Sequence, residues 1–176
     1  MVFTVSAAVT PPSLLFFMGL AGAGKTFCGT LVAQRLGYFS YDLDQDLIPE
    51  MQDAIRSRTA FTPEMRSKYF KVISDKIGEL SAIHPKLILM QAAYKRENRE
   101  FLLEHHPTLI FIHVAAPIDL IMARLRKRGD SILPEYAQTM ARGFEAPKGS
   151  PILVNDTEDT RELVARFSAL FGLYSP

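Results

Sequence analysis

An uncharged, glycine-rich segment near the amino terminus constrains this chain most. Residues 19–26 read G-L-A-G-A-G-K-T, after an apolar run at 13–18 and before a stretch at 25–36 whose apolar residues recur at helical spacing. Small residues let successive backbone N–H groups surround phosphate oxygens, and the start of a helix adds partial positive charge. The pattern therefore predicts a buried strand, a phosphate-binding loop and a helix, in that order.

The loop also predicts which residues contact a nucleotide. The residues expected to present backbone amides are Gly19, Gly22, Ala23 and Gly24. We expect Lys25 to contact the β- and γ-phosphates of ATP and Thr26 to bind Mg²⁺ through its hydroxyl. Cys28, one turn into the helix, is assigned to the nucleotide site as a small buried residue and not as a reactive thiol. The alternative interpretation is an ordinary glycine-rich turn with an exposed lysine.

Strand-like and helix-like segments alternate along the rest of the chain. Short apolar runs lie at 38–42, 86–90, 109–114 and 152–154, and helical patterns at 45–58, 62–84, 96–106, 117–128 and 159–171. This alternation predicts an α/β fold of one domain, residues 1–176, with a five-stranded parallel sheet and helices on both faces. Ligands of such sheets bind beyond the carboxyl ends of the strands.

Composition excludes several classes of protein. One cysteine in 176 residues excludes a disulfide framework and a cysteine-rich zinc site, and is typical of a reducing compartment. A net charge of +1 argues against a general nucleic-acid binder. The uncharged residues 1–24 are interrupted by Pro11 and Pro12, so we expect no membrane span and a cytoplasmic protein. A small-molecule partner is expected, and a homodimer is left open.

Two carboxylates follow the second strand. Asp42 and Asp44 are two residues apart, so their side chains point the same way if the extended conformation continues through Leu43. One carboxylate would bind Mg²⁺ while the other accepts the proton of an attacking hydroxyl. The alternative is that Asp44 caps a helix that begins at Gln45.

A basic helix end and a polar segment follow the fourth strand. Arg124 and Arg128 lie one helical turn apart, and guanidinium groups stabilise the charge of a transferring phosphoryl group. The alternative is a basic helix end that complements the helix dipole. Residues 129–149 carry the Gly and Pro content of a mobile segment. We therefore expect a lid, over about 124–149, that excludes water from the site.

With these motifs the sequence resembles the P-loop small-molecule kinases of the gluconate kinase and shikimate kinase group, the gluconate kinases more closely. The matching elements are the phosphate loop, D-L-D at 42–44, Arg66, Q-A-A-Y-K at 91–95, Arg99, the arginines at 124 and 128, and F-E-A-P at 144–147. The resemblance implies a P-loop NTPase fold with ATP and Mg²⁺ as ligands. It implies the following roles: Asp44 as catalytic base and substrate contact, Asp42 near Mg²⁺, Arg66 on the substrate's carboxylate, Tyr94 and Lys95 as substrate contacts, and Arg124 and Arg128 at the nucleotide and the phosphoryl group.

The sequence also departs from these families around the expected substrate pocket. Leu43 stands where gluconate kinases usually have glycine, and residues 58–66 keep Arg66 but lack the family's glycine and paired acids. Residues 91–93 stand where shikimate kinases have a glycine triplet. We therefore expect an altered pocket in a kinase that phosphorylates a hydroxyl of a small metabolite, foremost a gluconate-like sugar acid. The alternatives are a kinase of nucleosides, nucleotides or polynucleotide ends, and a nucleotide-binding regulatory module without turnover.

Overall fold

A five-stranded parallel sheet forms the centre of the molecule. The computed structural model describes residues 11–128 and 141–173. The strands are β1 (Leu14–Met18), β2 (Phe39–Asp42), β3 (Leu87–Met90), β4 (Ile110–Ala115) and β5 (Ile152–Val154). Their order is β2-β3-β1-β4-β5, so β1, the strand that leads into the phosphate loop, is central. The α/β fold and the parallel sheet predicted from the sequence are confirmed.

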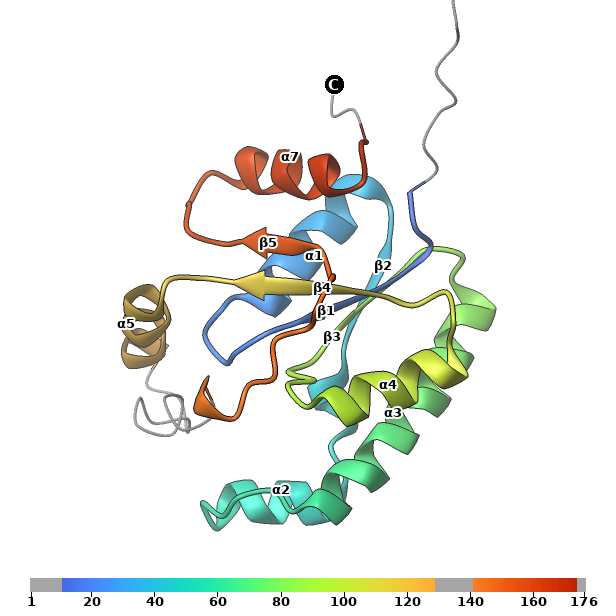
Figure 1. The fold of residues 1–176 in the computed structure, drawn as a ribbon, viewed down its shortest axis with the longest axis vertical. Helices are drawn as coiled ribbons and strands as arrows, with labels where there is room; N and C mark the ends of the chain where they lie inside the picture. Colours follow the sequence, from blue (N-terminus) through green and yellow to red (C-terminus); the bar gives the residue numbers. More distant parts are fainter. Residues whose placement is uncertain (1–10, 129–140, 174–176) are drawn as a thin grey trace, which may run out of the picture.

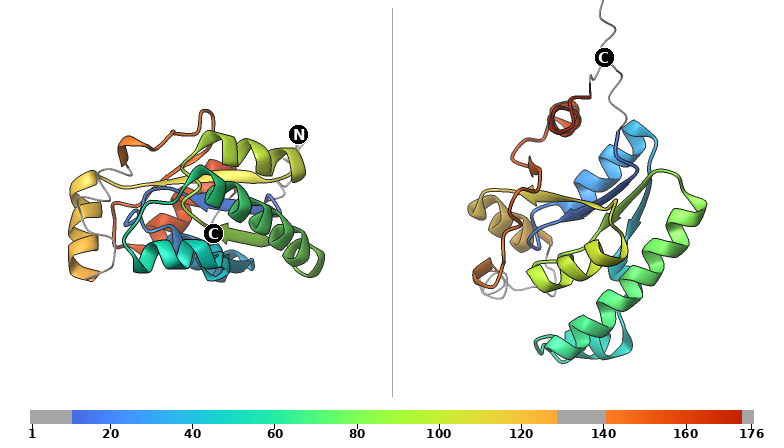
Figure 2. Two further views of the ribbon diagram at one scale, coloured as in Figure 1. Left: turned by 90° about the horizontal axis from the view of Figure 1, so that it is seen from below. Right: turned by 45° about the vertical axis from the view of Figure 1, so that its right-hand side comes forward.

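Helices cover both faces of the sheet, as Figures 1 and 2 show. The helices are α1 (Lys25–Leu36), α2 (Pro49–Arg56), α3 (Pro63–Ile83), α4 (Arg96–His105), α5 (Ile118–Arg128) and α7 (Thr160–Leu170). Phe17 packs in the apolar cluster on the side of α1 and α7, whereas Phe16 packs in the cluster on the side of α3 and α4. All five side chains of β1 are buried because both of its faces are covered, which explains the continuous apolar run.

The segment after β2 differs from the predicted helix at 45–58. The chain forms a 3-10 turn, η1 (Leu43–Asp46), then an extended link, and only then α2 (Pro49–Arg56). The first residue of α2 is a proline, which has no N–H to donate and disfavours helical conformation in the preceding residue. Ile48 is accordingly extended, with φ −63° and ψ 152°. Asp42 caps η1 through its side chain.

The predicted lid is only partly described. Residues 141–142 are helical and residues 143–151 form an irregular link to β5, while residues 129–140 lie outside the described part of the chain. Figure 1 shows α5 beyond the carboxyl end of β4, next to the turn between β1 and α1. Among the described residues, no helix combines the length and the apolar character needed to cross a bilayer.

Candidate active site

The phosphate loop links β1 to α1 and contacts both α5 and the end of β5. Gly24 is the N-cap of α1 in a left-handed conformation, φ 93°, and a Cβ there would lie 2.1 Å from Nδ2 of Asn155. Gly22 is also left-handed, φ 82°, and packs against side chains of α5. Both positions therefore require glycine on conformational and steric grounds. Lys25, at the first turn of α1, donates from Nζ to the carbonyl of Leu20 at 3.1 Å.

Thr26 and Asp42 meet at the carboxyl edge of the sheet. The Thr26 hydroxyl donates to Oδ2 of Asp42 at 2.8 Å, and the other carboxylate oxygen accepts from the backbone N–H of Asp44 at 3.1 Å. Asp42 is thus the capping residue, and the alternative in which Asp44 caps a helix at Gln45 is wrong. The strand ends at Asp42, so a tight turn, and not continued strand alternation, brings the two carboxylates together.

A residue of α3 stabilises the turn that carries Asp44. Leu43 is fully buried, and its carbonyl accepts a 2.5 Å hydrogen bond from the hydroxyl of the buried Tyr69. Burial, together with the charges of the nearby aspartates, raises the pKa of Tyr69, which keeps its hydroxyl protonated and able to donate. Leu43 therefore anchors the turn in the core, a role that glycine at this position could not fill.

Asp44 lies among charged and polar groups at the open edge of the site. Its Oδ1 accepts from Nε2 of Gln91 at 3.3 Å, and Gln91 comes from the end of β3. Partial removal from water and the charge of Asp42 raise the pKa of Asp44, while Lys25 and the Gln91 hydrogen bond act in the opposite direction. The side chain keeps an exposed edge, so a ligand can reach its carboxylate. The fold therefore gathers Lys25, Thr26, Asp42 and Asp44 in one place.

Arg66 and Tyr94 form a second part of the site. The guanidinium of Arg66, on α3, lies 5.4 Å from the centroid of the Tyr94 ring, on the loop between β3 and α4. The Arg66 Nε is buried and has no hydrogen-bond partner among the described residues. A half-buried guanidinium stacked on a ring, with donor capacity left over, suits an anionic group of a ligand.

Arg124 and Asn155 hold the far side of the phosphate loop. Arg124 donates to the carbonyls of Ala23 and Asn155 at 3.4 and 3.2 Å, and Asn155 donates from Nδ2 to the carbonyl of Ala23 at 2.8 Å. Asn155 is 1% exposed, and its Oδ1 has no partner among the described residues. The sequence analysis missed Asn155. The feature that could have identified Asn155 is its position: it is the first polar residue after the last strand, at the edge of the sheet where ligands bind.

Three other residues predicted for the site, Cys28, Lys95 and Arg128, are not placed with this group by the described structure. Cys28 is 1% exposed and packs in the apolar core, and burial raises the pKa of its thiol to about 12. Lys95 is paired with Glu145 at 3.0 Å. Arg128 is the last residue of α5, and its side chain lies outside the description. The geometry therefore brings Lys25, Asp42 and Asp44 together, whereas the Cys28 side chain is buried in the core.

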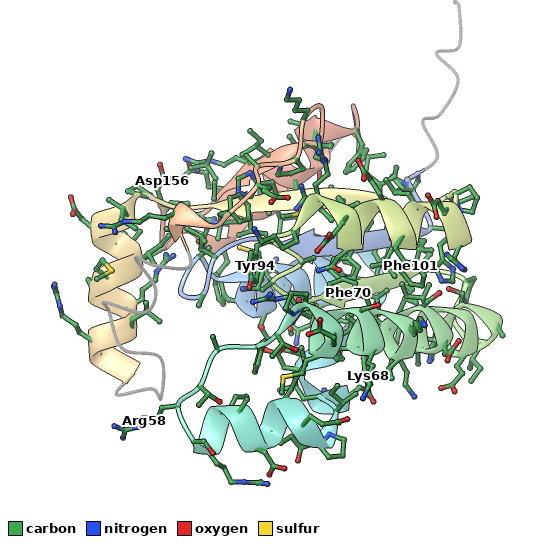
Figure 3. All side chains as sticks on the ribbon, turned by 60° about the horizontal axis from the view of Figure 1, so that its bottom comes forward. Arg58, Lys68, Phe70, Tyr94, Phe101 and Asp156 are labelled. Atoms are coloured by element: carbon green, nitrogen blue, oxygen red, sulfur yellow. The ribbon has the colours of Figure 1, made fainter. Side chains whose placement is uncertain are left out.

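A separate groove of about 380 Å³ lies between α3 and α4. Its lining residues are Pro63, Glu64, Ser67, Phe70, Glu97, Asn98 and Phe101. Figure 3 shows Phe70 and Phe101 between these two helices. Glu64 and Glu97 lie in the first turns of their helices, where carboxylates offset the positive helix end. Helix stabilisation therefore accounts for these two acids without a ligand.

The sequence of this chain is similar to the sequences of known small-molecule kinases. The family model for shikimate kinase matches residues 21–148, most of the chain. A shikimate kinase of Ralstonia nicotianae is 36% identical over 124 residues, which are 69% of this chain and 62% of that protein. A probable gluconokinase of Mus musculus is 23% identical over 77% of this chain and 84% of that one. The chain spans about three fifths of the length of several shikimate kinases that it matches, that of Ralstonia nicotianae among them.

The fold also matches solved structures. A gluconokinase from Sinorhizobium meliloti superposes with a TM-score of 0.78, covers 92% of each chain and is 22% identical. The match supports the P-loop architecture, and the resemblance expected from the loop, the D-L-D element and the arginines is confirmed. This chain therefore belongs to the shikimate kinase family.

Proposed function

We propose that this chain transfers the γ-phosphoryl group of ATP to a hydroxyl of a small polyhydroxy carboxylic acid, with a gluconate-like sugar acid as the first candidate. The observation that carries the proposal is the convergence of Thr26, Asp42 and Asp44 beside Lys25. A phosphate loop alone serves many reactions, but a second carboxylate within reach of the metal-binding pair is what proton removal from a hydroxyl requires.

The donor set at Thr26 and Asp42 fits Mg²⁺. A hydroxyl and a carboxylate oxygen 2.8 Å apart are hard ligands, and Mg²⁺ bound with a nucleotide takes one or two protein ligands plus phosphates and waters. Among the described residues there is no group of three or more acidic, histidine or cysteine side chains that could hold a metal by itself. That is expected where phosphates complete the coordination. Bound Mg²⁺ would neutralise charge on the phosphates and orient them.

Asp44 is proposed as the catalytic base. It takes the proton of the acceptor hydroxyl as the new bond forms between that oxygen and the γ-phosphorus, and the bond from the phosphorus to the β-phosphate oxygen breaks. A pKa raised above the ordinary aspartate value makes the carboxylate a better proton acceptor near neutral pH. Lys25 and Arg124 would stabilise the charge on the phosphoryl oxygens. Arg128 remains proposed for the same role.

Arg66 and Tyr94 are proposed as the acceptor's main contacts. The unpartnered Nε of Arg66 and the ring beneath its guanidinium form a binding position for one carboxylate. Gln91 supports a sugar acid over shikimate, because its side chain spans to Asp44 and to the N–H of Ala93, at 3.3 and 2.7 Å. Residues 91–93 stand where shikimate kinases have a glycine triplet, so the surroundings of Asp44 differ from those expected in a shikimate kinase.

The test is ADP formation in a coupled assay with gluconate, other sugar acids, shikimate and nucleosides as acceptors. We expect stimulation by a sugar acid, and a Lys25→Met variant purified in parallel should lose it. Stimulation by nucleosides alone would favour the nucleoside-kinase alternative. ATP binding without stimulation by any acceptor would favour a regulatory module and contradict the proposal.

A further inference from the structure

A network of hydrogen bonds joins the loop after β3 to the segment that precedes β5. Glu145 accepts from Lys95 Nζ at 3.0 Å and from the backbone N–H of Arg96 at 2.7 Å. The N–H of Glu145 donates to the carbonyl of Tyr94 at 3.0 Å. Arg99 donates to the carbonyls of Ala93 and Glu145 at 2.8 and 2.6 Å. Four of these bonds connect two segments that lie far apart in the sequence, and the bond from Arg99 to Ala93 lies within the segment after β3.

Glu145 also supplies the cap that α4 lacks. The N-cap residue of α4, Lys95, makes no side-chain capping bond, and the Glu145 carboxylate binds the free N–H of Arg96 instead. A carboxylate at this end of a helix is favoured by the free N–H groups and the helix dipole. These bonds lower the pKa of Glu145, so it stays ionised.

Arg99 holds a strained backbone position. Ala93 has φ 36°, a left-handed conformation that is rare without glycine. Its carbonyl accepts from Arg99, and its N–H donates to Oε1 of Gln91 at 2.7 Å. Arg99 is only 5% exposed, and its charge is satisfied by backbone carbonyls. Such strain persists only where surrounding contacts enforce it, and here the result is the placement of the next residue, Tyr94.

Resting on the proposed function, we infer that Lys95, Glu145 and Arg99 are positioning residues that hold Tyr94 against Arg66 and do not contact the acceptor themselves. The Lys95 ammonium forms an ion pair with Glu145. It lies 6.0 Å from the centroid of the Tyr94 ring, farther than the Arg66 guanidinium, which lies at 5.4 Å. Arg66 is then the cation that selects an acidic acceptor. This assignment replaces the direct substrate contact that the sequence analysis expected of Lys95.

A double-mutant cycle tests the assignment. Lys95→Met and Glu145→Gln each remove the ion pair, so each should raise the acceptor KM by about tenfold, with kcat and the KM for ATP little changed. The double variant should match the single variants, because each already removes the same contact. Glu100→Gln is the matched control: Glu100 pairs with Arg96 on the exposed side of the same helix, and its removal should leave all constants unchanged.

Two results would overturn the inference. If Lys95 bound the acceptor directly, Lys95→Met would raise the KM well beyond Glu145→Gln, and the two effects would multiply in the double variant. Unchanged acceptor KM in both single variants would also overturn it.

Hydrogen exchange separates this inference from the proposed function. In Glu145→Ala, the amides of residues 94–97 should exchange faster than in the unmodified protein, whether or not any acceptor is phosphorylated. Glu145 is exposed, so this variant should keep the fold, which a thermal melt checks. Unchanged exchange would show that the hydrogen bonds of Glu145 do not hold the loop after β3. Absence of phosphoryl transfer in the unmodified protein would count against the proposed function alone.

Discussion

The hydroxyl of Thr26 donates a 2.8 Å hydrogen bond to the carboxylate of Asp42, joining the first helix to the end of the neighbouring edge strand. The two residues are 16 positions apart, and the bond fixes the spacing of the two oxygen atoms that we propose as Mg²⁺ ligands. Because Asp42 also caps the turn that carries Asp44, the same carboxylate fixes the proposed metal position and the proposed base.

Replacing Thr26 should therefore weaken metal use more than nucleotide binding. We expect Thr26→Val to raise the Mg²⁺ concentration needed for half-maximal rate by about 10- to 100-fold. Thr26→Ser keeps the hydroxyl and should stay within a few fold of the unmodified protein. Metal titrations of the ATP-dependent rate measure both, and equal behaviour of the two variants would contradict the assignment.

Asp44→Asn should abolish most of the activity without unfolding the protein. Loss of a general base lowers kcat by about 10²- to 10⁴-fold, while ATP affinity should persist because the phosphate loop is intact. Asp53→Asn is the control, since Asp53 forms an exposed ion pair with Arg56 on α2. Steady-state rates and ATP titrations of both variants check the prediction, and a kcat for Asp44→Asn near that of the control would refute the role of the base.

The pH profile should reveal the environment of Asp44. Its pKa is raised in the fold by partial burial and by Asp42, so the rate should fall as the pH decreases through that raised pKa, where the base becomes protonated. Gln91→Met removes a hydrogen bond that lowers this pKa. The acid limb of kcat should then move to higher pH. A shift to lower pH, or none, would show that another group controls the limb.

The sequence predicted the strands and the glycine-rich loop because both depend on local pattern, whereas the two acids come together through a turn that strand alternation did not predict. Continuous apolar runs require burial on both faces, and the glycine loop requires left-handed residues such as Gly24. A helix lies within the predicted range 45–58, but its start was predicted wrongly, because apolar spacing does not reveal that Asp42 caps a separate turn ahead of a proline. Lys95 and Glu145 are 50 positions apart in the sequence and meet only in the folded chain, so no local pattern predicts their ion pair.

Asn155 offers a test of the buried contact with the phosphate loop. Asn155→Ala removes the hydrogen bond to the Ala23 carbonyl, and we expect a loss of about 1–3 kcal/mol in the free energy of unfolding together with weaker ATP binding. Gly24→Ala should lower the free energy of unfolding further. The new Cβ would clash with Asn155 Nδ2, and residue 24 would have to keep its left-handed conformation. Adding Asn155→Ala to Gly24→Ala should recover part of the loss, since it removes the clash but not the strain.

The neighbouring Asp156 supplies the control for these variants. It forms an ion pair with Arg166 that is partly exposed to solvent, so Asp156→Asn should change the free energy of unfolding by less than about 1 kcal/mol. Urea denaturation of the four variants and of the unmodified protein measures the differences. Equal stability of Asn155→Ala and Asp156→Asn would contradict a structural role for the buried amide.

The most direct measurement is a single-turnover experiment with ATP labelled in its γ-phosphate, gluconate as acceptor, and the unmodified protein beside Asp44→Asn. The account predicts that the label appears in a phosphate ester of the acceptor, at least about 100-fold faster with the unmodified protein. Label released only as inorganic phosphate, label that stays on ATP, or equal transfer by the two proteins would contradict it.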